Sequence, residues 1–565
     1  EDRGPAPSAG VLPFSGRRPA RPLPAANANA ADWGSCAAAA FGCGLSKGET
    51  VKQAITVALA LVLGAVGLAF PARAANLGTG QCAPAAHPGG EWRSYGGSLA
   101  NQRNQTAETK LNPSTVANTA KAWSFNIADE AQAGVLGGGT LQNTPVVADG
   151  CVYLASSSGF VFAVNADTGE RVWTSPKMPG SAAGTLLGGV ITGSPSVSGG
   201  KVYVGVSRLN DPFVAALDQK TGEILWIAPT LDPAKKNDAY RMTIIASPVV
   251  VNGMIFQGMM GDENSAGSRG GYAILDAATG KLLDQEFTIS DAEYAAGYRG
   301  ASVWCTAAAD AAAGFVYACG GNPASKQEEA RYANALLKID IRRTLAGGAA
   351  NPAFGKIVAA YKGNYDQYYP GLDRQPACDQ VPTTVVWSPT CVQMDLDFGA
   401  SPSLYNIDVA GTPVQVLGDL QKAGIYHAVY ADSMQLAWNT VVGTPGPVYN
   451  AGSPAVDGSN VYVGASLPTQ VFGLSNDRGR YRWVTPIATG APIHFESVST
   501  ANGVVYEIDN SGVLNILDAA TGVPVKQFVL SADVGAPANS QSSQGVSIAR
   551  NTIYAASSSY VVAYR

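Results

Sequence analysis

A handful of side chains between residues 263 and 422 have types that bind metal ions, planar rings or protons. They are Glu263, Trp304, Asn322, Asp395 with its near neighbour Asp397, and Lys422. Carboxylate and amide oxygens are the ligands that hard divalent cations prefer. A positioned carboxylate can also take a proton as a general base, and an ammonium group stabilises negative charge that develops on an oxygen. An indole ring offers a flat apolar face to another ring.

Each of these residues also has an ordinary structural interpretation when it is taken alone. Glu263 stands in a Gly/Ser-rich loop, where carboxylates are usually solvated. Trp304 is of a type that usually packs in a core. Asn322 lies beside Gly and Pro, as turn residues do, and Lys422 alone would be a surface residue. A functional interpretation therefore depends on whether one fold brings them together.

A repeated pattern indicates what that fold is. From about Asn143 onward, units open with a small residue and Pro, continue as a β-rich run, and often close on Asp-x-x-Thr-Gly with a Trp a few positions later. The openings are Thr144-Pro145, Ser194-Pro195, Ser247-Pro248, Ser401-Pro402 and Ser453-Pro454. The turns span 218–222, 276–280 and 518–522, with 165–169 as a variant, and the closing residues are Trp173, Trp226, Trp438 and Trp483. Asp and Gly suit such turns because Asp accepts from the backbone ahead and Gly adopts positive φ.

The number of units follows from an apolar-aromatic pair in each of them. The pairs are Val152-Tyr153, Val202-Tyr203, Ile255-Phe256, Val316-Tyr317, Ile425-Tyr426, Val461-Tyr462, Val505-Tyr506 and Ile553-Tyr554. Most lie 36 to 61 residues apart, and one interval of 109 must hold an insertion. Eight such repeats predict an all-β protein, an eight-bladed β-propeller of four-stranded antiparallel blades.

The two ends of the chain are expected to close this ring. After Gly545 only three strands fit before Arg565, so the last blade lacks one strand. Residues 122–125 carry a closing-strand Trp but precede the first blade. We predict that this N-terminal strand is the outermost strand of blade eight, which leaves no sheet edge open.

With these elements in place, the chain resembles the quinoprotein alcohol dehydrogenases, which use pyrroloquinoline quinone (PQQ). Trp92, Tyr95-Gly96-Gly97, Asn101, Asn112-Pro113-Ser114 and Trp123 are similar to the opening segment of that family. The repeat itself is shared with non-catalytic propellers such as those of outer-membrane assembly. The residues of the site must therefore separate the two branches.

The resemblance implies a role for each candidate residue. Glu263, Asn322 and Asp395 match metal ligands, with Ca²⁺ expected first and a lanthanide as the alternative. Trp304 stands 18 residues before Asn322, the spacing of the family's PQQ-stacking Trp, and Lys422 matches the cation on the quinone oxygen.

Two carboxylates compete for the role of base. The segment from Asp395 to Pro402 resembles the one that bears the family's catalytic Asp. The 27-residue distance to Lys422 favours Asp395, while Asp397 is the second candidate. A second acid two places further on is also similar to lanthanide-using members, where it adds a metal ligand.

Several features depart from the well-known members. The adjacent cysteines found near their cofactor are absent, and Ile245 and Met260 replace small hydroxyl residues that bond PQQ in methanol-oxidising members. Cys305 directly follows Trp304. The single-subunit layout resembles that of polyvinyl-alcohol dehydrogenases, but no Cys-x-x-Cys-His motif for an attached c-type haem is present.

The resemblance implies an exported, PQQ- and metal-dependent dehydrogenase that oxidises an alcohol to a carbonyl. Electrons would pass to a separate acceptor, such as a c-type cytochrome. The alternative is a non-catalytic PQQ-repeat propeller that serves as an interaction scaffold in the cell envelope, and a weaker one is a propeller that binds another polar ligand. A net charge of −5 without a basic run argues against nucleic-acid binding.

The first 74 residues are predicted to be a targeting region. Lys47 and Lys52 precede an apolar run from Ala54 to Phe70, and small residues lead to a cleavage site after Ala74. We expect residues 47–74 to be a signal peptide and 1–46 a disordered extension from a start site assigned too far upstream. The propeller would then span 75–565, in the periplasm, the cell envelope or the medium. A membrane anchor is the alternative, although 17 apolar residues are at the lower limit for spanning.

Six cysteines follow residue 74, an even number that suggests disulfides in an exported chain. Their pairing is open, with Cys378–Cys391 as the first expectation. Both lie in an expected insertion between Ile341 and Met394, which also contains Tyr361, Tyr365, Tyr368 and Tyr369. This insertion either shapes a substrate entrance or packs on its own blade.

Overall fold

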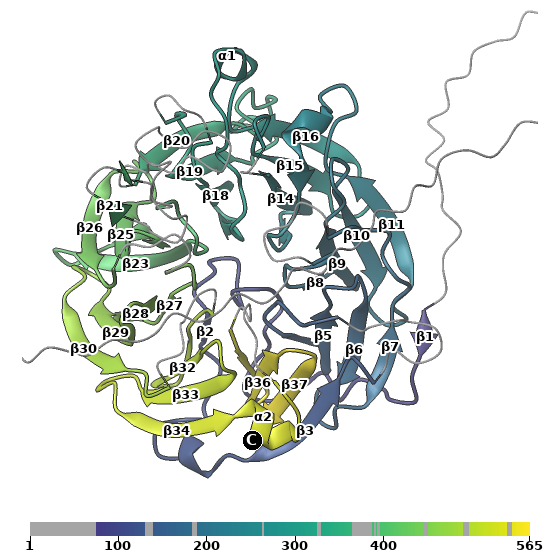
Figure 1. The fold of residues 1–565 in the computed structure, drawn as a ribbon, viewed down its shortest axis with the longest axis vertical. Coiled ribbons are helices and arrows are strands. Elements are labelled where there is room, and N and C mark those ends of the chain that lie inside the picture. Colours follow the sequence, from purple (N-terminus) through teal and green to yellow (C-terminus); the bar gives the residue numbers. More distant parts are fainter. Residues whose placement is uncertain are drawn as a thin grey trace, which may run out of the picture. The chain divides into compact units, whose positions relative to one another are not determined.

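Short strands rich in Val, Ile and Tyr form antiparallel sheets that are arranged around a centre (Figure 1). The computed structural model describes residues 75–129, 139–182, 189–262, 265–324, 329–363, 396–444, 450–489, 496–538 and 545–565, together with two short strands between 387 and 392. These residues form eight sheets of four or five strands and one two-stranded ribbon. The predicted eight-bladed propeller is therefore confirmed.

Each of the eight sheets contains four consecutive strands of one repeat or, in the last sheet, three strands and an N-terminal one. Sheets one to four contain β4 Val146–Ala148, β5 Cys151–Ala155, β6 Val161–Asn165, β7 Arg171–Thr174; β8 Ser196–Ser198, β9 Lys201–Val206, β10 Phe213–Asp218, β11 Ile224–Pro229; β13 Val249–Val251, β14 Met254–Gly261, β15 Gly271–Asp276, β16 Leu282–Phe287; and β17 Ala308–Asp310, β18 Phe315–Gly320, β19 Ala335–Asp340, β20 Ile357–Lys362. Sheets five to eight contain β23 Ser403–Val409, β24 Thr412–Gln421, β25 Ile425–Tyr430, β26 Leu436–Val441; β27 Ala455–Val456, β28 Asn460–Ser466, β29 Thr469–Ser475, β30 Tyr481–Pro486; β31 Ser499–Ala501, β32 Val504–Ile508, β33 Val513–Asp518, β34 Pro524–Val529; and β35 Ser547–Ala549, β36 Thr552–Ser557, β37 Tyr560–Tyr564 with β3 Lys121–Asn126.

A few further elements extend this plan. They are β1 Asn76–Leu77 on sheet one, β12 Met242–Thr243 on sheet three, β2 Asn104–Gln105 parallel to β31, the ribbon β21 Trp387–Ser388 with β22 Cys391–Val392, the helices α1 Asp291–Ala295 and α2 Leu530–Val534, and the 3₁₀ turns η1 Val116–Asn118 and η2 Asp238–Tyr240. In the part of the chain that is described, no helix is long and apolar enough to cross a membrane. The expected signal peptide and extension, residues 1–74, lie outside the described residues.

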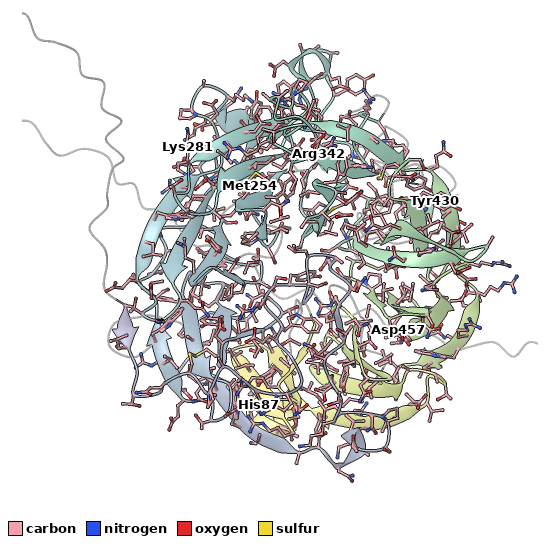
Figure 2. The ribbon with its side chains drawn as sticks, turned by 180° about the vertical axis from the view of Figure 1, so that it is seen from behind. His87, Met254, Lys281, Arg342, Tyr430 and Asp457 are labelled. Atoms are coloured by element: carbon pink, nitrogen blue, oxygen red, sulfur yellow. A yellow bond between two sulfur atoms is a disulfide. The ribbon has the colours of Figure 1, made fainter. Side chains whose placement is uncertain are left out.

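The first strand of each repeat lies innermost, and the outer strands form the rim (Figure 1). The inner strands contact one another in sequence order, and β35 of the last sheet contacts β4 of the first. Figure 2 shows the ring from behind, with side chains filling the space between sheets. These sandwiched side chains include the predicted apolar-aromatic pairs, whose rings are almost completely buried.

The predicted turns and closing tryptophans join neighbouring sheets. In the turn after β10, the amides of Lys220 and Thr221 donate to Asp218 Oδ1, both at 2.9 Å. Trp173 of the preceding sheet lies against Gly222 and donates from Nε1 to the Gln219 carbonyl at 3.1 Å. Corresponding indole bonds come from the outer strands of other sheets, at Trp123, Trp226, Trp438 and Trp483. Turn and tryptophan therefore act as one unit of contact between sheets.

Sheet five departs from the repeat of the other sheets. In seven sheets the apolar-aromatic pair lies in the second strand, but Ile425-Tyr426 begins β25, the third strand of sheet five. The pair still identifies the right sheet, because β25 is as buried as a second strand. The expected insertion also begins too early, since Tyr361 lies in β20, the outer strand of sheet four. Its later part, including Cys378, lies outside the described residues.

A segment from Trp92 to Gln105 crosses one end of the ring. Its backbone is hydrogen-bonded to the inner strands of six sheets. The pairs are Trp92 with Val147, Arg93 with Val197, Leu99 with Ala309, Ala100 with Leu404, Gln102 with Val456 and Arg103 with Thr500. We call residues 92–105 the hub segment. Its hydrogen bonds satisfy backbone N–H and C=O groups of the inner strands that would otherwise lack partners at the centre of the ring.

Two disulfides are present among the described cysteines. Cys82 is bonded to Cys151 and fastens the N-terminal segment to sheet one. Cys305 is bonded to Cys319 within sheet four. The expected Cys378–Cys391 pair lies outside the described residues, since no side chain is described at either position.

Candidate functional site

The candidate residues that are described lie at one end of sheets four and five. Trp304 precedes the inner strand β17, and Asn322 follows the second strand β18. Asp397 precedes the inner strand β23, and Lys422 directly follows the second strand β24. Since inner and second strands are antiparallel, the start of one and the end of the other meet at the same edge. The repeat itself therefore brings these four residues to one end of sheets four and five.

Asp397 lies at the centre of this group. Its Oδ1 is 2.6 Å from the ammonium nitrogen of Lys422, and its Oδ2 accepts a 3.0 Å hydrogen bond from Trp304 Nε1. The backbone amide of Lys422 also donates to the Asp397 carbonyl at 3.0 Å. The side chains of Asp397 and Lys422 are 0% and 6% exposed. One carboxylate thus connects the cation of sheet five to the indole of sheet four.

The indole of Trp304 forms an apolar floor beside this ion pair. It packs in a small cluster with Ile245, Met260 and Ala451, and Lys422 Nζ lies 4.8 Å from the ring centre. Ile245 and Met260 are the two residues that replace hydroxyl groups of methanol-oxidising enzymes. Their contact with Trp304 makes this part of the site apolar where hydroxyl groups would have made it polar.

Space beside the carboxylate is preserved by a glycine. A Cβ atom at Gly321 would lie 3.1 Å from Trp304 Cδ1 and 3.2 Å from Asp397 Oδ2. Asn322, the next residue, is completely buried, and its carbonyl accepts from the amide of Ala301 at 2.8 Å. The Gly-Gly-Asn sequence therefore brings the backbone next to Asn322 close to the Trp–Asp–Lys group without crowding it.

The two charged groups of the site, Asp397 and Lys422, are shielded from water. Removal of an ion pair from water is costly unless geometry and hydrogen bonds compensate, and here Asp397 accepts from both a cation and an indole. A second buried carboxyl, Asp419 of β24, accepts from the backbone amide of Leu420 at 2.8 Å. Burial raises the pKa of Asp419 well above its ordinary value, and the negative charge of Asp397 raises it further.

The residues predicted from the sequence divide into two groups. Trp304, Asp397 and Lys422 contact one another and the backbone next to Asn322 lies beside them, whereas Glu263 and Asp395 lie outside the described residues. Among the two acids that competed as base, Asp397 is the one whose contacts are described. Within the described ranges, no group of three or more His, Cys, Asp and Glu side chains is arranged to hold a metal ion. The two remaining predicted carboxylate ligands, Glu263 and Asp395, fall outside those ranges.

Sequence reasoning missed two features that support the site. The Cys305–Cys319 disulfide joins the residue after Trp304 to the strand that leads to Asn322. His427, to which no role was assigned, is buried behind Lys422 and bonded to Gln421. The position of Cys305 beside Trp304 was a visible signal, but nothing in the sequence linked His427 to its partners.

Family models match two parts of the chain. Residues 92–343 match the model described as the glucose/ethanol/alcohol dehydrogenase β-propeller domain, called PQQ. Residues 398–565 match a second PQQ model, described as outer membrane protein assembly factor BamB. The first match contains Trp304 and Asn322, and the second begins one residue after Asp397.

Curated relatives and solved structures agree with these matches. The chain is 30% identical over 206 residues to the dehydrogenase subunit of the quinone alcohol dehydrogenase of Gluconacetobacter polyoxogenes, which covers 36% of this chain and 26% of that protein. It is 32% identical over 200 residues to the quinohemoprotein alcohol dehydrogenase of Comamonas testosteroni, covering 35% and 26%. The alignments thus span about a quarter of each relative's length.

The crystal structure of the Comamonas testosteroni enzyme superposes with a TM-score of 0.64 at 18% identity, over 85% of this chain and 81% of that one. A europium-containing methanol dehydrogenase gives a TM-score of 0.59 at 16% identity, over 82% and 89%. At these identities the superpositions show the fold. They show that the chain has the eight-bladed propeller fold, and residues 92–343 of it match the PQQ dehydrogenase propeller model.

Proposed function

We propose that this protein is an exported PQQ- and metal-dependent dehydrogenase that oxidises an alcohol to a carbonyl compound. The observation that carries the proposal is the position of Asp397, which is bonded to Lys422 on one side and to the indole of Trp304 on the other. A base, a cation and an aromatic floor are the groups that such a reaction needs. In this chain all three lie in contact with one another.

The residues present fit the implied cofactor. PQQ is a planar, anionic ortho-quinone, and the Trp304 ring offers it a flat apolar surface beside a buried cation. The missing side chain at Gly321 leaves the edge of the indole and Asp397 Oδ2 uncrowded. The buried amide of Asn322 and the carboxylate of Asp397 are oxygen donors suited to Ca²⁺ or a lanthanide ion. Glu263 and Asp395 are proposed to complete the ligand set.

Each side chain has a distinct task in this proposal. PQQ held against Trp304 would supply a hydride acceptor for the alcohol carbon, and a metal ion held by Asn322 and Asp397 would supply a Lewis acid. Asp397 takes the hydroxyl proton, since its carboxylate is the acceptor at the centre of the group. Lys422 stabilises the negative charge that develops on the quinone oxygen. Trp304 excludes water from one face and, through Nε1, orients the carboxylate.

The setting of the reaction follows from the chain and from its relatives. Disulfides persist in oxidising compartments, and Cys82–Cys151 and Cys305–Cys319 support export to the periplasm, envelope or medium. The curated relatives are named as alcohol dehydrogenases, and one is a 1-butanol dehydrogenase whose name specifies cytochrome c. We therefore propose an alcohol substrate and an external electron acceptor such as a c-type cytochrome.

Replacement of the proposed base tests the mechanism. Asp397→Asn keeps an oxygen that can accept from Trp304 but cannot take a proton, so turnover should fall at least about 100-fold, as expected for loss of a general base. The assay would use PQQ, Ca²⁺ or La³⁺, an alcohol and an artificial electron acceptor.

Asp419→Asn is the matched control for this variant. Asp419 is an equally buried carboxyl of the same sheet, and burial already favours its neutral form. This control should retain wild-type turnover. Undiminished activity in Asp397→Asn would remove Asp397 from the mechanism.

A ligand titration separates the enzyme from the alternative scaffold, which the match to an assembly-factor model favours. Purified protein is titrated with PQQ in the presence of Ca²⁺ or La³⁺ while thermal unfolding is followed. A saturable rise in melting temperature that requires both quinone and metal supports the holoenzyme, because a ligand that binds only the folded state stabilises it. The absence of any shift with either metal would favour the scaffold.

A further inference from the structure

Four buried or half-buried side chains form a continuous hydrogen-bonded chain behind the candidate site. Tyr361 of β20 bonds through its hydroxyl to His427 Nδ1 at 3.0 Å. His427 Nε2 bonds to Gln421 Oε1 at 2.9 Å, and Gln421 Nε2 donates to Asn334 Oδ1 at 2.9 Å. His427, Gln421 and Asn334 are completely buried. We call Tyr361, His427, Gln421 and Asn334 the four-residue network.

Two members of the network, Gln421 and Asn334, adjoin the backbone of the two halves of the site. Gln421 directly precedes Lys422, so its side chain holds the end of β24 from which the cation projects. The backbone amide of Asn334 donates to the Gly321 carbonyl at 2.8 Å, next to Asn322. The chain of hydrogen bonds therefore runs from the segment that carries Lys422 to the one that carries Asn322. These segments belong to sheets four and five, which the hydrogen bond from Trp304 to Asp397 also joins.

The amide of Gln421 fixes the state of the histidine. Because Gln421 donates from Nε2 to Asn334, its Oε1 faces His427 and needs a donor. His427 must therefore carry its proton on Nε2 and accept from the Tyr361 hydroxyl at Nδ1. Burial lowers the pKa of His427 to about 4, which agrees with a neutral ring at neutral pH. Apolar contact with Phe398, next to Asp397, holds the ring edge-on at 5.5 Å between centroids.

We propose that His427 is a positioning residue for the cofactor site. It holds the Gln421 amide in one orientation, and this amide sets the spacing between the backbone at Lys422 and the backbone at Gly321–Asn322. The inference rests on the proposed function, because it assigns the network to the binding of metal and quinone. Partners behind a ligating residue commonly affect metal affinity 10- to 100-fold when they are removed.

Substitutions at His427 test this role against a purely structural one. His427→Leu removes the donor at similar volume, whereas His427→Gln retains an amide donor at the position of Nε2. Binding is measured on the purified protein by quenching of tryptophan fluorescence with PQQ at saturating Ca²⁺, and with Ca²⁺ at saturating PQQ. We expect His427→Leu to weaken binding about tenfold and His427→Gln to restore most of it.

Asn515→Leu is the matched control variant. Asn515 belongs to a buried amide network in sheet seven, where it donates to Glu507 Oε2 at 2.7 Å and accepts from Gln527 at 2.9 Å. Its loss should lower the melting temperature much as His427→Leu does but leave PQQ and Ca²⁺ affinity unchanged. If the two variants weaken binding equally, or if His427→Leu binds as wild type, the positioning role is refuted.

A measurement without ligands distinguishes this failure from failure of the proposed function. Amide hydrogen exchange is followed in the ligand-free protein at residues 319–322 and 420–423. His427→Leu should accelerate exchange at both segments at least about tenfold, while Asn515→Leu should affect neither. If the wild type binds no PQQ, the proposed function fails, and coupled exchange at the two segments would still establish the positioning. Exchange unchanged in His427→Leu would overturn it.

Discussion

Two charged residues, Asp397 and Lys422, keep almost no contact with solvent. A buried ion pair is often no more stabilising than apolar residues of similar volume, and breaking one by removal of a partner typically costs about 3–5 kcal/mol. The pair is therefore a poor device for stability alone. Its contact with the edge of an indole, beside a glycine that leaves room, instead suits a site that receives a charged planar ligand.

At the same scale, His427 makes folding dependent on pH. Its pKa is about 4 in the folded protein because burial disfavours the charged ring, against about 6.5 for a solvated His. The unfolded chain therefore takes up a proton as pH falls through 6.5, while the folded chain does not until about 4. The contribution of His427 to stability is complete above pH 6.5 and is lost between 6.5 and 4. Linkage gives about 2 kcal/mol lost between pH 7.5 and pH 5.

Urea unfolding of the wild type and of His427→Gln at pH 7.5 and pH 5 measures this effect. The variant lacks the titrating ring but keeps a polar donor, so its free energy of unfolding should fall by about 2 kcal/mol less than that of the wild type over this interval. Equal losses in both proteins would show that other groups, and not His427, carry the acid sensitivity.

The candidate site shows how far residue types alone lead. Trp304, Asn322 and Lys422 were recognisable because the family's spacing falls on corresponding places in successive repeats, and the sheet edges bring these places together. Asp395 was favoured over Asp397 by its distance to Lys422, but both precede the same strand and their spacings differ by only two residues. The network of His427 was also invisible, because its bonds link residues 87 positions apart between two sheets.

At the scale of elements, the contact between a closing tryptophan and the next turn is the unit that holds neighbouring sheets. Gly222 illustrates it, since φ there is +73° and an added Cβ would lie 2.5 Å from the Trp173 ring. Gly253 has nearly the same φ, +72°, but nothing lies within 4 Å of its added Cβ. The two glycines therefore separate backbone strain from loss of packing.

Alanine substitutions at these positions should differ in their effects on stability. Gly253→Ala meets only the left-handed conformation and should cost about 1 kcal/mol. Gly222→Ala must also displace the indole of Trp173. This overpacking should lower the free energy of unfolding by a further 1–3 kcal/mol or so. Thermal unfolding of both variants against wild type checks this, and equal shifts would mean that the indole contact contributes nothing.

Elements were predictable where their signal is local. The Asp-x-x-Thr-Gly turns and the tryptophans after them lie within ten residues of each other, and the structure has them as expected. Sheet five was counted correctly but read through β25 instead of β24, because β24 lacks the apolar-aromatic pair. Disulfide pairing depended on which strands become neighbours, so Cys305–Cys319 could not be derived from spacing alone.

At the scale of the whole molecule, two N-terminal segments connect distant parts of the ring. The hub segment is bonded to inner strands of six sheets. The strand β3 pairs with β37, the last strand of the chain, and is the outermost strand of the eighth sheet. The backbone of Arg565 exchanges hydrogen bonds of 2.9 and 3.0 Å with Ala120 next to β3. If β3 closes the ring, a covalent link between β3 and β37 should raise the stability of the whole propeller.

An engineered disulfide between β3 and β37 tests this closure. Asn126 and Tyr560 are directly opposite each other in these strands, and both are half-buried. A disulfide in Asn126→Cys/Tyr560→Cys would enclose most of the propeller in one loop, and the chain-entropy relation gives about 6 kcal/mol as its upper effect. If the ring opens between these strands when it unfolds, the oxidised variant should melt well above wild type.

The control is a second crosslink that does not span the closure. Ile425→Cys/Val441→Cys joins directly opposite residues of β25 and β26 within sheet five, for which the same relation gives about 3 kcal/mol. Both variants are compared, oxidised, by thermal unfolding with the native disulfides intact. A larger rise for the β3–β37 link supports ring closure by the N-terminal strand. A rise no larger than that of the local link would mean that unfolding begins elsewhere, and that β3 only covers the edge of the last sheet.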